Sequence, residues 1–281
     1  MTADGGSPRL AGVIGSPIGH SLSPVLHRAA YQALGLADWS YRRTEVESGN
    51  LRAHLAGLDG SWVGVSVTMP GKEEALRESS EASGRALRTG AANTLVRRND
   101  GWWADNTDID GITRAFRERG CGRPRSGWLI GSGATARSAL VAFFDLGVTH
   151  VVIQSRSEPR SETMQLAREL GLMVTTRTYD QGWPDLAGVD VAMSTAPGRA
   201  ELPPPPSVST GVAEGTVAMD VVYQRRDARW AAQLSAAGAE VIDGSAMLLH
   251  QAVEQVRLMT GLEPPVEAMR TALHEALKAG E

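Results

Sequence analysis

Short apolar stretches bounded by glycine or proline alternate with stretches of helical spacing along the chain. Residues 9–15 are largely apolar and end in glycine, which is typical of a short buried strand. Ser23 and Pro24 then predict a helix to about residue 34, because serine caps helices well and proline suits the first helical position. A strand, a helix and a strand are predicted next, at residues 39–46, 51–58 and 62–67. This order predicts a parallel sheet covered by helices.

Two serine hydroxyls lie beside the start of the first predicted helix. Helix capping alone explains Ser23, whereas Ser21 has no such local role. The exposed N–H groups and the dipole at a helix N-terminus favour a negative charge. Together with the two hydroxyls, they predict a binding site for a small anion.

The strand predicted at residues 62–67 ends in a turn that carries Thr68, Pro70 and Lys72. Pro70 ends the strand, because proline has no backbone N–H to donate and its φ is fixed. A lysine just beyond a strand end is well placed to face a cleft. Exposure to solvent is the commoner situation for a lone lysine, so this stretch alone leaves the role of Lys72 open.

The next segment combines short helices with a predicted β-hairpin. Helical segments run to about Leu87, and strands near residues 90–95 and 102–104 flank an Asn-Asp-Gly turn at residues 99–101. An acidic cluster at residues 105–111 leads into a further helix. Capping explains this cluster unless other residues give it a second role, because Asp and Asn favour helix starts.

A second unit is expected from about Arg125, and it opens with a glycine-rich loop. The loop lies between a predicted strand at residues 127–130 and a predicted helix at residues 136–146, which is the setting that makes G-x-G-x-x-A indicative of dinucleotide binding. The first glycine permits the tight turn, the second lets the backbone approach a pyrophosphate, and the alanine allows close packing. The predicted cofactor-binding residues are Gly131, Ser132, Gly133, Ala134, Thr135 and Ala136.

The end of the next predicted strand, at residues 151–154, indicates which nucleotide binds. A site for NAD normally places an acidic side chain here, on the ribose 2′-hydroxyl. This chain has Ser155, Arg156 and Ser157, with Arg160 shortly after. Guanidinium groups bind phosphate in a bidentate manner. The two arginines therefore predict a site for the 2′-phosphate of NADP, and the alternative is that they are exposed surface residues.

The rest of the chain continues the alternation of strands and helices. Asp243 is expected to cap a long apolar helix that ends near Met259, and a final helix follows Pro265 and ends near Lys278. The other predicted elements are strands at residues 173–176, 189–193, 217–222 and 240–242, and a helix at residues 229–237.

Composition narrows the function. The 281 residues suffice for one large or two ordinary domains. The formal net charge is −4 and no basic patch is present, so nucleic acid is not an expected partner. Cys121 is the single cysteine, which rules out an intramolecular disulfide and suits a reducing cytoplasm. Neither a signal peptide nor the roughly 20-residue apolar run of a membrane span is recognisable, so no membrane association is expected.

A predicted NADP site joined to another α/β unit indicates an oxidoreductase. No tyrosine is followed four residues later by lysine, and no cysteine–histidine cluster has zinc-site spacing, so no metal is expected. His20 and His27 fit either an acid–base or a structural role. Lys72 with Asp108 remains. An ammonium can supply the proton and the charge stabilisation that hydride delivery to a ketone needs, and a neighbouring carboxylate would orient it.

These residues together make the chain resemble the shikimate dehydrogenase family, over about residues 10–277. Residues 15–24 (GSPIGHSLSP) are similar to the family's substrate-carboxylate motif, which implies that Ser21 and Ser23 bind the carboxylate. Residues 64–72 resemble the family's G-x-N-V-T-x-P-x-K motif. This implies Thr68 as a substrate contact and Lys72 as the catalytic residue.

The resemblance extends to further polar positions. Asn93 and Gln251 match substrate contacts, Asp108 matches the partner of Lys72, and Tyr223 also falls at a substrate position. Tyr223-Gln224 lacks the proline that often follows in its motif. Ser66 stands where the family usually has asparagine, which implies a shortened or water-mediated contact with a ring hydroxyl. Residues 155–160 resemble the family's N-R-T-x-x-R phosphate clamp, with serine at 155 and 157 and both arginines kept.

The resemblance implies an α/β architecture of two domains. An N-terminal substrate domain (1–106) would be rejoined by the C-terminal helices (244–281), with a Rossmann-like NADP domain between them (107–243). The implied activity is NADPH-dependent reduction of 3-dehydroshikimate to shikimate by a cytoplasmic monomer or homodimer. The alternatives are a paralogue acting on quinate or an amino analogue, and a non-catalytic NADP-binding sensor.

Overall fold

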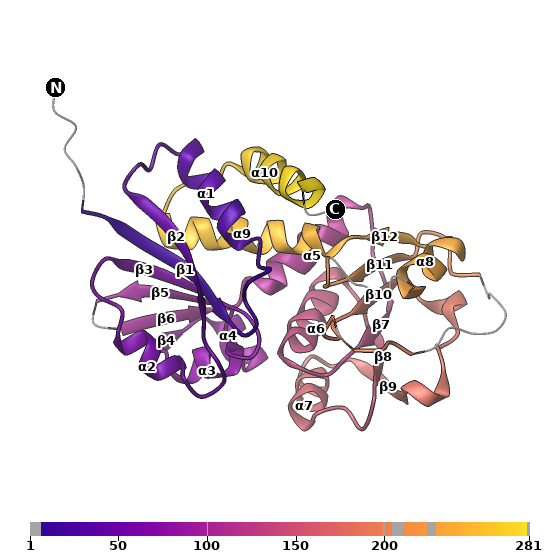
Figure 1. Cartoon of the computed structure of the whole chain (residues 1–281). Helices are drawn as coiled ribbons and strands as arrows, with labels where there is room; N and C mark the ends of the chain where they lie inside the picture. Colours follow the sequence, from indigo (N-terminus) through magenta and orange to yellow (C-terminus); the bar gives the residue numbers. More distant parts are fainter. Residues whose placement is uncertain (1–6, 100, 199, 204–210, 224–228, 280–281) are drawn as a thin grey trace. The chain divides into compact units, whose positions relative to one another are not determined.

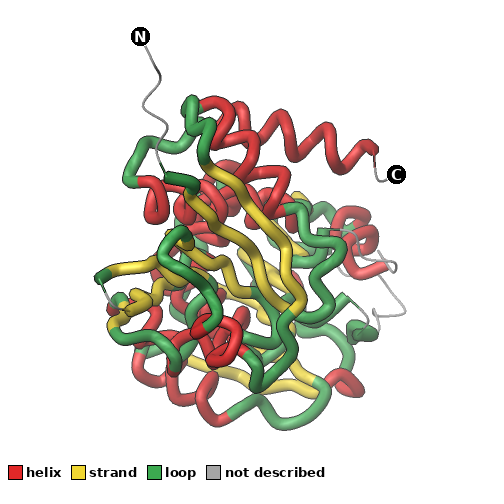
Figure 2. The backbone as a smooth tube through the Cα atoms, turned by 60° about the vertical axis from the view of Figure 1, so that its left-hand side comes forward, coloured by secondary structure: helices red, strands yellow, loops and turns green. Residues whose placement is uncertain are grey.

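The computed structural model describes residues 7–99, 101–198, 200–203, 211–223 and 229–279. The chain forms two compact units. The first combines the residues up to Thr107 with those from Gln251 onward, and the second is Asp108–His250. Helices and strands alternate along both (Figures 1 and 2).

The first unit contains a mixed six-stranded sheet in the order β2-β1-β3-β5-β6-β4. As predicted, β1 pairs in parallel with both β2 and β3. The predicted hairpin adds antiparallel pairing, because β5 joins both β3 and β6 in that sense. Asp100 of the hairpin turn lies outside the described residues. The strands are β1 (Arg9–Gly15), β2 (Trp39–Glu45), β3 (Trp62–Val67), β4 (Glu81–Ala82), β5 (Thr94–Arg98) and β6 (Gly101–Asp105).

The C-terminal helices return to the first unit. Helix α10, yellow in Figure 1, packs beside α1, which is indigo. Leu26 of α1 and both Met269 and Leu273 of α10 are almost completely buried. The helices of this unit are α1 (Ser23–Ala33), α2 (Leu51–Ala56), α3 (Lys72–Arg77), α4 (Gly84–Thr89) and α10 (Val266–Ala279), together with the second part of α9 (Gly244–Thr260).

The second unit contains a parallel six-stranded sheet in the order β12-β11-β10-β7-β8-β9. Its first strand lies inside the sheet, with the next two strands on one side and the last three on the other. This is the strand order of the Rossmann fold. The strands are β7 (Ser126–Ile130), β8 (His150–Ser155), β9 (Met173–Thr178), β10 (Val191–Ser194), β11 (Val217–Asp220) and β12 (Glu240–Ile242).

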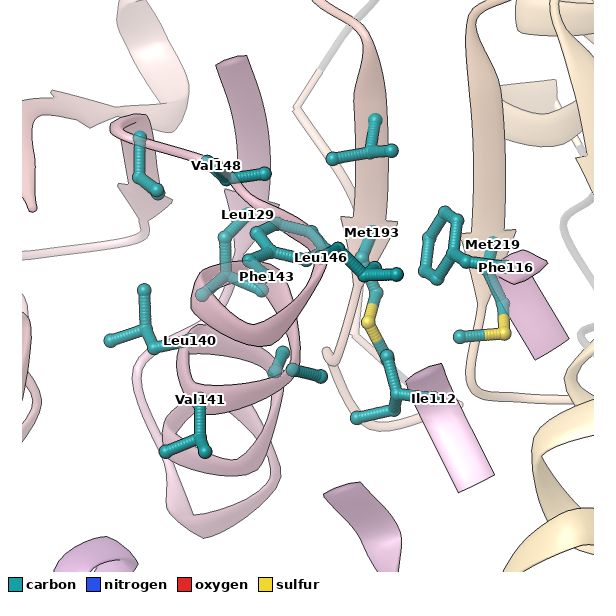
Figure 3. Packing of buried hydrophobic residues seen from close by; sticks show 14 of the residues in the cluster. Ile112, Phe116, Leu129, Leu140, Val141, Phe143, Leu146, Val148, Met193 and Met219 are labelled. Atoms are coloured by element: carbon teal, nitrogen blue, oxygen red, sulfur yellow. The ribbon is translucent and has the colours of Figure 1, made fainter. Parts of the chain in front are cut away.

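Four helices flank this sheet in the described part of the second unit, besides the start of α9. In Figure 3, Phe143 of α6 lies beside Leu129 of β7, and Ile112 and Phe116 of α5 lie near the methionines of β10 and β11. Helix α7 was not predicted from the sequence. The helices are α5 (Asp108–Glu118), α6 (Ala134–Leu146), α7 (Ser161–Glu169) and α8 (Arg229–Ala236), with short 3₁₀ turns at Tyr179–Gln181 and Leu186–Gly188.

Gly15 ends β1 where the backbone of a neighbouring loop comes close. A Cβ atom there would lie 2.7 Å from the carbonyl oxygen of Met69 and would also collide with the methyl group of Thr68. We expect Gly15→Ala to lower the free energy of unfolding by about 1–3 kcal/mol, because the backbone must move to relieve the overlap. Urea denaturation followed by circular dichroism measures this. Gly19→Ala is the control, since nothing lies within 4 Å of its added Cβ; equal midpoints for the two variants would contradict the prediction.

Candidate active site

Two loops of the first unit meet at the carboxyl ends of β1 and β3. The N–H of Ser16 donates to the carbonyl of Met69 at 3.0 Å, and the N–H of Thr68 donates to the carbonyl of Ile14 at 2.9 Å. Adjacent parallel strands release their loops at the same edge of a sheet, where ligands of α/β proteins commonly bind. The structure therefore brings together the loop predicted to bind a carboxylate and the turn that leads to Lys72.

The serine-bearing loop is held by Arg43 of β2. Its guanidinium donates to the carbonyl oxygens of Gly19 and Ser21, at 2.7 Å each. These two bonds fix the backbone on both sides of His20. No local pattern of residues pointed to this role of Arg43, because the bonds join positions that lie 24 and 22 residues apart in the chain.

The prediction that Ser23 caps helix α1 is wrong. The helix begins at Ser23 itself, its N-cap is Leu22, and no side chain caps it. The carbonyl of Leu22 already accepts the N–H groups of Val25 at 3.0 Å and of Leu26 at 3.3 Å, and the second of these is the first bond of the α-helix. The hydroxyl of Ser21 instead accepts the N–H of Ser23 at 3.3 Å. The local role therefore belongs to Ser21, because the backbone turns one residue earlier than predicted.

Lys72 lies at the start of α3 and is half-buried. Its carbonyl accepts the N–H of Ala92 at 2.8 Å. The next residue, Asn93, donates its N–H to the carbonyl of Asp105 at 3.1 Å, and its own carbonyl accepts the N–H of Val67 at 2.7 Å. Two predicted site residues, Lys72 and Asn93, thus come from backbone segments that are bonded side by side.

The carboxamide of Asn93 is the centre of a buried hydrogen-bond network. Its Oδ1 accepts the backbone N–H of Thr107 and the hydroxyl of Thr94, both at 2.8 Å. Its Nδ2 donates to the hydroxyl of Thr107 at 3.0 Å and to Oε1 of Gln251 at 3.4 Å. Asn93 and Gln251 are 2% and 8% exposed. The structure therefore brings these two predicted substrate contacts together.

Ser66 belongs to the same network. Its hydroxyl accepts from the phenol of Tyr41 at 2.6 Å and donates to Oε1 of Gln255 at 2.8 Å. Nε2 of His27 lies 3.3 Å from the same Oε1. Ser66 is 3% exposed. Tyr41 and Gln255 thus both bond this short side chain, and the sequence did not point to either residue.

Burial keeps the aromatic groups of this network neutral. It lowers the pKa of His27 from 6.5 to about 3, against the opposing hydrogen bond with Gln255. It also raises the pKa of Tyr41 well above 10, although the bond to Ser66 opposes this. The ring of Tyr41 stacks on that of His27 with centroids 4.0 Å apart. Of the two roles left open for His27, a neutral structural one fits these surroundings.

Asp105, the first member of the predicted acidic cluster, forms an ion pair. Nε and Nη2 of Arg85 contact its two carboxylate oxygens at 2.6 and 2.5 Å, and the hydroxyl of Ser83 donates to it at 2.5 Å. Burial alone would raise the pKa of Asp105, but these bonds hold it below its ordinary value. Capping therefore does not explain this residue.

Asp108 is the first residue of α5 and is 4% exposed. It follows Thr107, whose N–H and hydroxyl are both bonded to the carboxamide of Asn93. The chain therefore leaves the first unit from a residue that is anchored beside the predicted substrate contacts. Lys72 belongs to the first unit and Asp108 begins the second, and their pairing stays a prediction.

The glycine-rich loop follows β7, at the point where the strand order of the second sheet reverses. Gly131 has φ +110°, and a Cβ there would collide with the hydroxyl of Thr195. Nothing lies within 4 Å of a Cβ built on Gly133, which is the N-cap of α6 and provides no side-chain cap. The helix begins at Ala134, two residues earlier than predicted. This open, positively polarised helix start fits a pyrophosphate.

The predicted 2′-phosphate clamp follows β8, the neighbour of β7. Arg156, Ser157 and Arg160 are exposed, and Arg160 immediately precedes α7. The hydroxyl of Ser155 donates to the carbonyl of Ser157 at 2.6 Å and so closes the turn. α7 is tied to the glycine-rich loop, because Thr163 donates to the carbonyl of Ser132 at 2.7 Å. The residues present therefore fit a nucleotide that carries a 2′-phosphate.

Tyr223 follows β11 and is half-buried, and Gln224 lies outside the described residues. Among the residues that the structure describes, no three His, Cys, Asp or Glu side chains are grouped as a metal site would require. None of the described helices has the length and apolar character needed to cross a bilayer.

A Rossmann unit with a phosphate-binding loop, combined with an α/β unit that carries a cluster of polar residues, defines a dinucleotide-dependent oxidoreductase. Residues 13–95 match the model of the shikimate dehydrogenase substrate binding domain, and residues 244–274 match that of the shikimate 5'-dehydrogenase C-terminal domain. A shikimate dehydrogenase (NADP(+)) of Methanothermobacter thermautotrophicus is 32% identical over 278 residues, which cover 97% of this chain and 98% of that protein.

Solved structures agree with these matches. The Mycobacterium tuberculosis shikimate dehydrogenase is 40% identical with a TM-score of 0.82, over 95% of this chain and all of the other. The shikimate 5-dehydrogenase of Thermus thermophilus, solved in complex with NADP(H) and shikimate, is 27% identical with a TM-score of 0.81, over 95% and 99% of the two chains. The chain described here belongs to the shikimate dehydrogenase family.

The buried His27 makes stability depend on pH. The unfolded chain binds a proton at this residue below about pH 6.5, whereas the folded chain does so only near pH 3. Between about pH 3 and pH 6.5, unfolding is therefore accompanied by the uptake of a proton at His27. The free energy of unfolding consequently decreases as the pH falls through this range. Wild type should lose about 1.4 kcal/mol per pH unit more than His27→Gln between about pH 5.5 and 4.5. Urea denaturation at each pH tests this, and parallel slopes for the two proteins would refute it.

Proposed function

We propose that this chain catalyses the reversible NADPH-dependent reduction of 3-dehydroshikimate to shikimate, in the pathway to chorismate and the aromatic amino acids. The observation that carries the proposal is the meeting of the loops after β1 and β3, beside the buried cluster around Asn93. This arrangement supports the proposal, because the segments predicted to bind the carboxylate, the hydroxyls and the ketone follow neighbouring strands of one sheet. The relatives' names point to the same reaction.

The substrate would be held by the first unit. Ser21 and Ser23 bind its carboxylate at the start of α1, where the helix dipole also favours a negative charge. Thr68, Asn93 and Gln251 bind the ring hydroxyls, and Tyr223 contributes from the second unit. Ser66 would support these contacts indirectly, since its hydroxyl is bonded to Tyr41 and Gln255.

Lys72 would donate the proton of the reaction. Reduction of the ketone places negative charge on its oxygen, and an ammonium beside that oxygen stabilises the charge and then protonates it. The chain contains 26 arginines and only two lysines, Lys72 and Lys278. Arginine cannot release its proton at neutral pH, which explains why lysine is needed here. Asp108 would orient the ammonium.

NADPH would bind to the second unit. Gly131, Ser132 and Gly133, with the first helical turn at Ala134, Thr135 and Ala136, would hold its pyrophosphate. Arg156 and Arg160, with Ser155 and Ser157, would hold its 2′-phosphate. When bound, NADPH supplies the hydride.

We also propose that the substrate domain comprises residues 1–106 and 244–281, and that residues 107–243 form the NADP domain. The chain would act in the cytoplasm as a monomer or homodimer. A single cysteine, Cys121, allows no intramolecular disulfide, which suits a reducing compartment.

Lys72→Ala should lower kcat for shikimate oxidation by two or more orders of magnitude, because proton transfer by a positioned group typically contributes about 10²–10⁴-fold. Lys72→Arg should also be slow, since it keeps the charge but not the proton transfer. NADPH absorbance measures both. Lys278→Ala removes the only other lysine and should match wild type. Wild-type turnover by Lys72→Ala with an unchanged circular dichroism spectrum would refute the assigned role.

Arg156→Ala should raise KM for NADP about tenfold or more, because a charge-assisted contact to the 2′-phosphate is lost. KM for NAD should stay within about twofold, since NAD lacks that phosphate. The control is Arg168→Ala, an exposed arginine of α7 whose Nε donates to the carbonyl of Met164. An unchanged KM for NADP in Arg156→Ala would place the phosphate site elsewhere.

A further inference from the structure

Gln255 is a buried carboxamide to which no motif of the sequence assigns a role. It lies on α9 one helical turn after Gln251, so the two side chains project from the same face of the helix. Only 1% of Gln255 is exposed. It is bonded to Ser66 of β3 and to Thr94 of β5. Thr94 is the residue that follows Asn93.

The partners of Gln255 determine which way its amide points. Oε1 accepts the hydroxyl of Ser66, which itself accepts from Tyr41, and lies 3.3 Å from Nε2 of His27. Nε2 of Gln255 faces two acceptors, the carbonyl of Asn93 at 3.2 Å and the hydroxyl of Thr94 at 3.0 Å. A flipped amide would turn Oε1 towards the carbonyl oxygen of Asn93, which can only accept, so this carbonyl fixes the orientation.

This orientation is passed on to Asn93. The hydroxyl of Thr94 accepts from Gln255 and donates its proton to Oδ1 of Asn93. That oxygen also accepts the N–H of Thr107. Oδ1 of Asn93 therefore faces Thr94 and Thr107, and its NH₂ faces Oε1 of Gln251 at 3.4 Å. In turn, Gln251 has its oxygen towards Asn93 and its NH₂ group on the other side.

We propose that Gln255 is a positioning residue that fixes the amide orientation of Asn93 and, through it, that of Gln251, the two predicted substrate contacts of this network. This inference rests on the proposed function of the site. Gln255 and Tyr41 compensate for the short Ser66, which stands where the family usually has a longer amide. The amide of Gln255 is bonded only to buried protein groups in this network, and it acts on the substrate through Asn93 and Gln251.

A steady-state assay with separate KM values for shikimate and NADP tests the proposal. Gln255→Met keeps the length of the side chain and removes all four bonds. It should raise KM for shikimate roughly tenfold, which is the effect expected when about one hydrogen bond to the substrate is lost through misalignment. KM for NADP should stay within about twofold and kcat should change less than KM for shikimate. Val256→Ala, a fully buried neighbour on the same helix, controls for destabilisation and should leave both KM values unchanged.

Thr94→Val provides a second, milder route, because it keeps Gln255 and removes only the hydroxyl that relays its orientation. It should raise KM for shikimate at least about threefold, and its effect should not add to that of Gln255→Met, because both break one relay. The inference would be overturned, with the proposed function intact, if the effects of the two substitutions on KM for shikimate simply added in the double variant. Wild-type KM values for shikimate in Thr94→Val and Gln255→Met would also overturn it. Failure of the wild-type chain to oxidise shikimate with NADP would overturn the proposed function and the inference with it.

Discussion

The carboxamide of Asn93 is buried in the first unit, so both its oxygen and its nitrogen must find hydrogen-bond partners there. Unpaired, either end would cost about 1–3 kcal/mol. The partners come from β5, from the segment that leaves the unit at Thr107 and from the helix that returns at Gln251. Satisfying one side chain thus ties three distant parts of the chain together, and the edge of the sheet that carries Lys72 is built around it.

Local patterns predicted the elements well, since strand ends and helix starts are written in nearby residues. The limits of β1, β3 and β12 agree with the predicted ones, and a glycine ends β1 as expected. The first helix was misplaced by one residue, which exchanged the roles of Ser21 and Ser23. Such an error is expected where several residues can each cap a helix, because only the backbone angles decide between them.

The contacts that orient the site could not be predicted in the same way. Ser66 and Gln255 lie 189 residues apart, and nothing in either neighbourhood indicates the other. Arg85 and Asp105 meet because two short elements fold onto β6. The glycine-rich loop was different, because a contiguous strand, loop and helix define it. Its place between a strand and a helix therefore followed from the sequence, apart from the earlier start of α6.

The packing of α10 on α1 has a consequence for how the protein is made. Synthesis reaches α1 before the second unit, whereas α10, which packs on it, is encoded after the second unit. The segment Asp108–His250 is uninterrupted and can complete its own core while synthesis continues. α1 is therefore made well before α10, and Leu26, which is almost completely buried in the folded chain, is not covered by α10 during that interval.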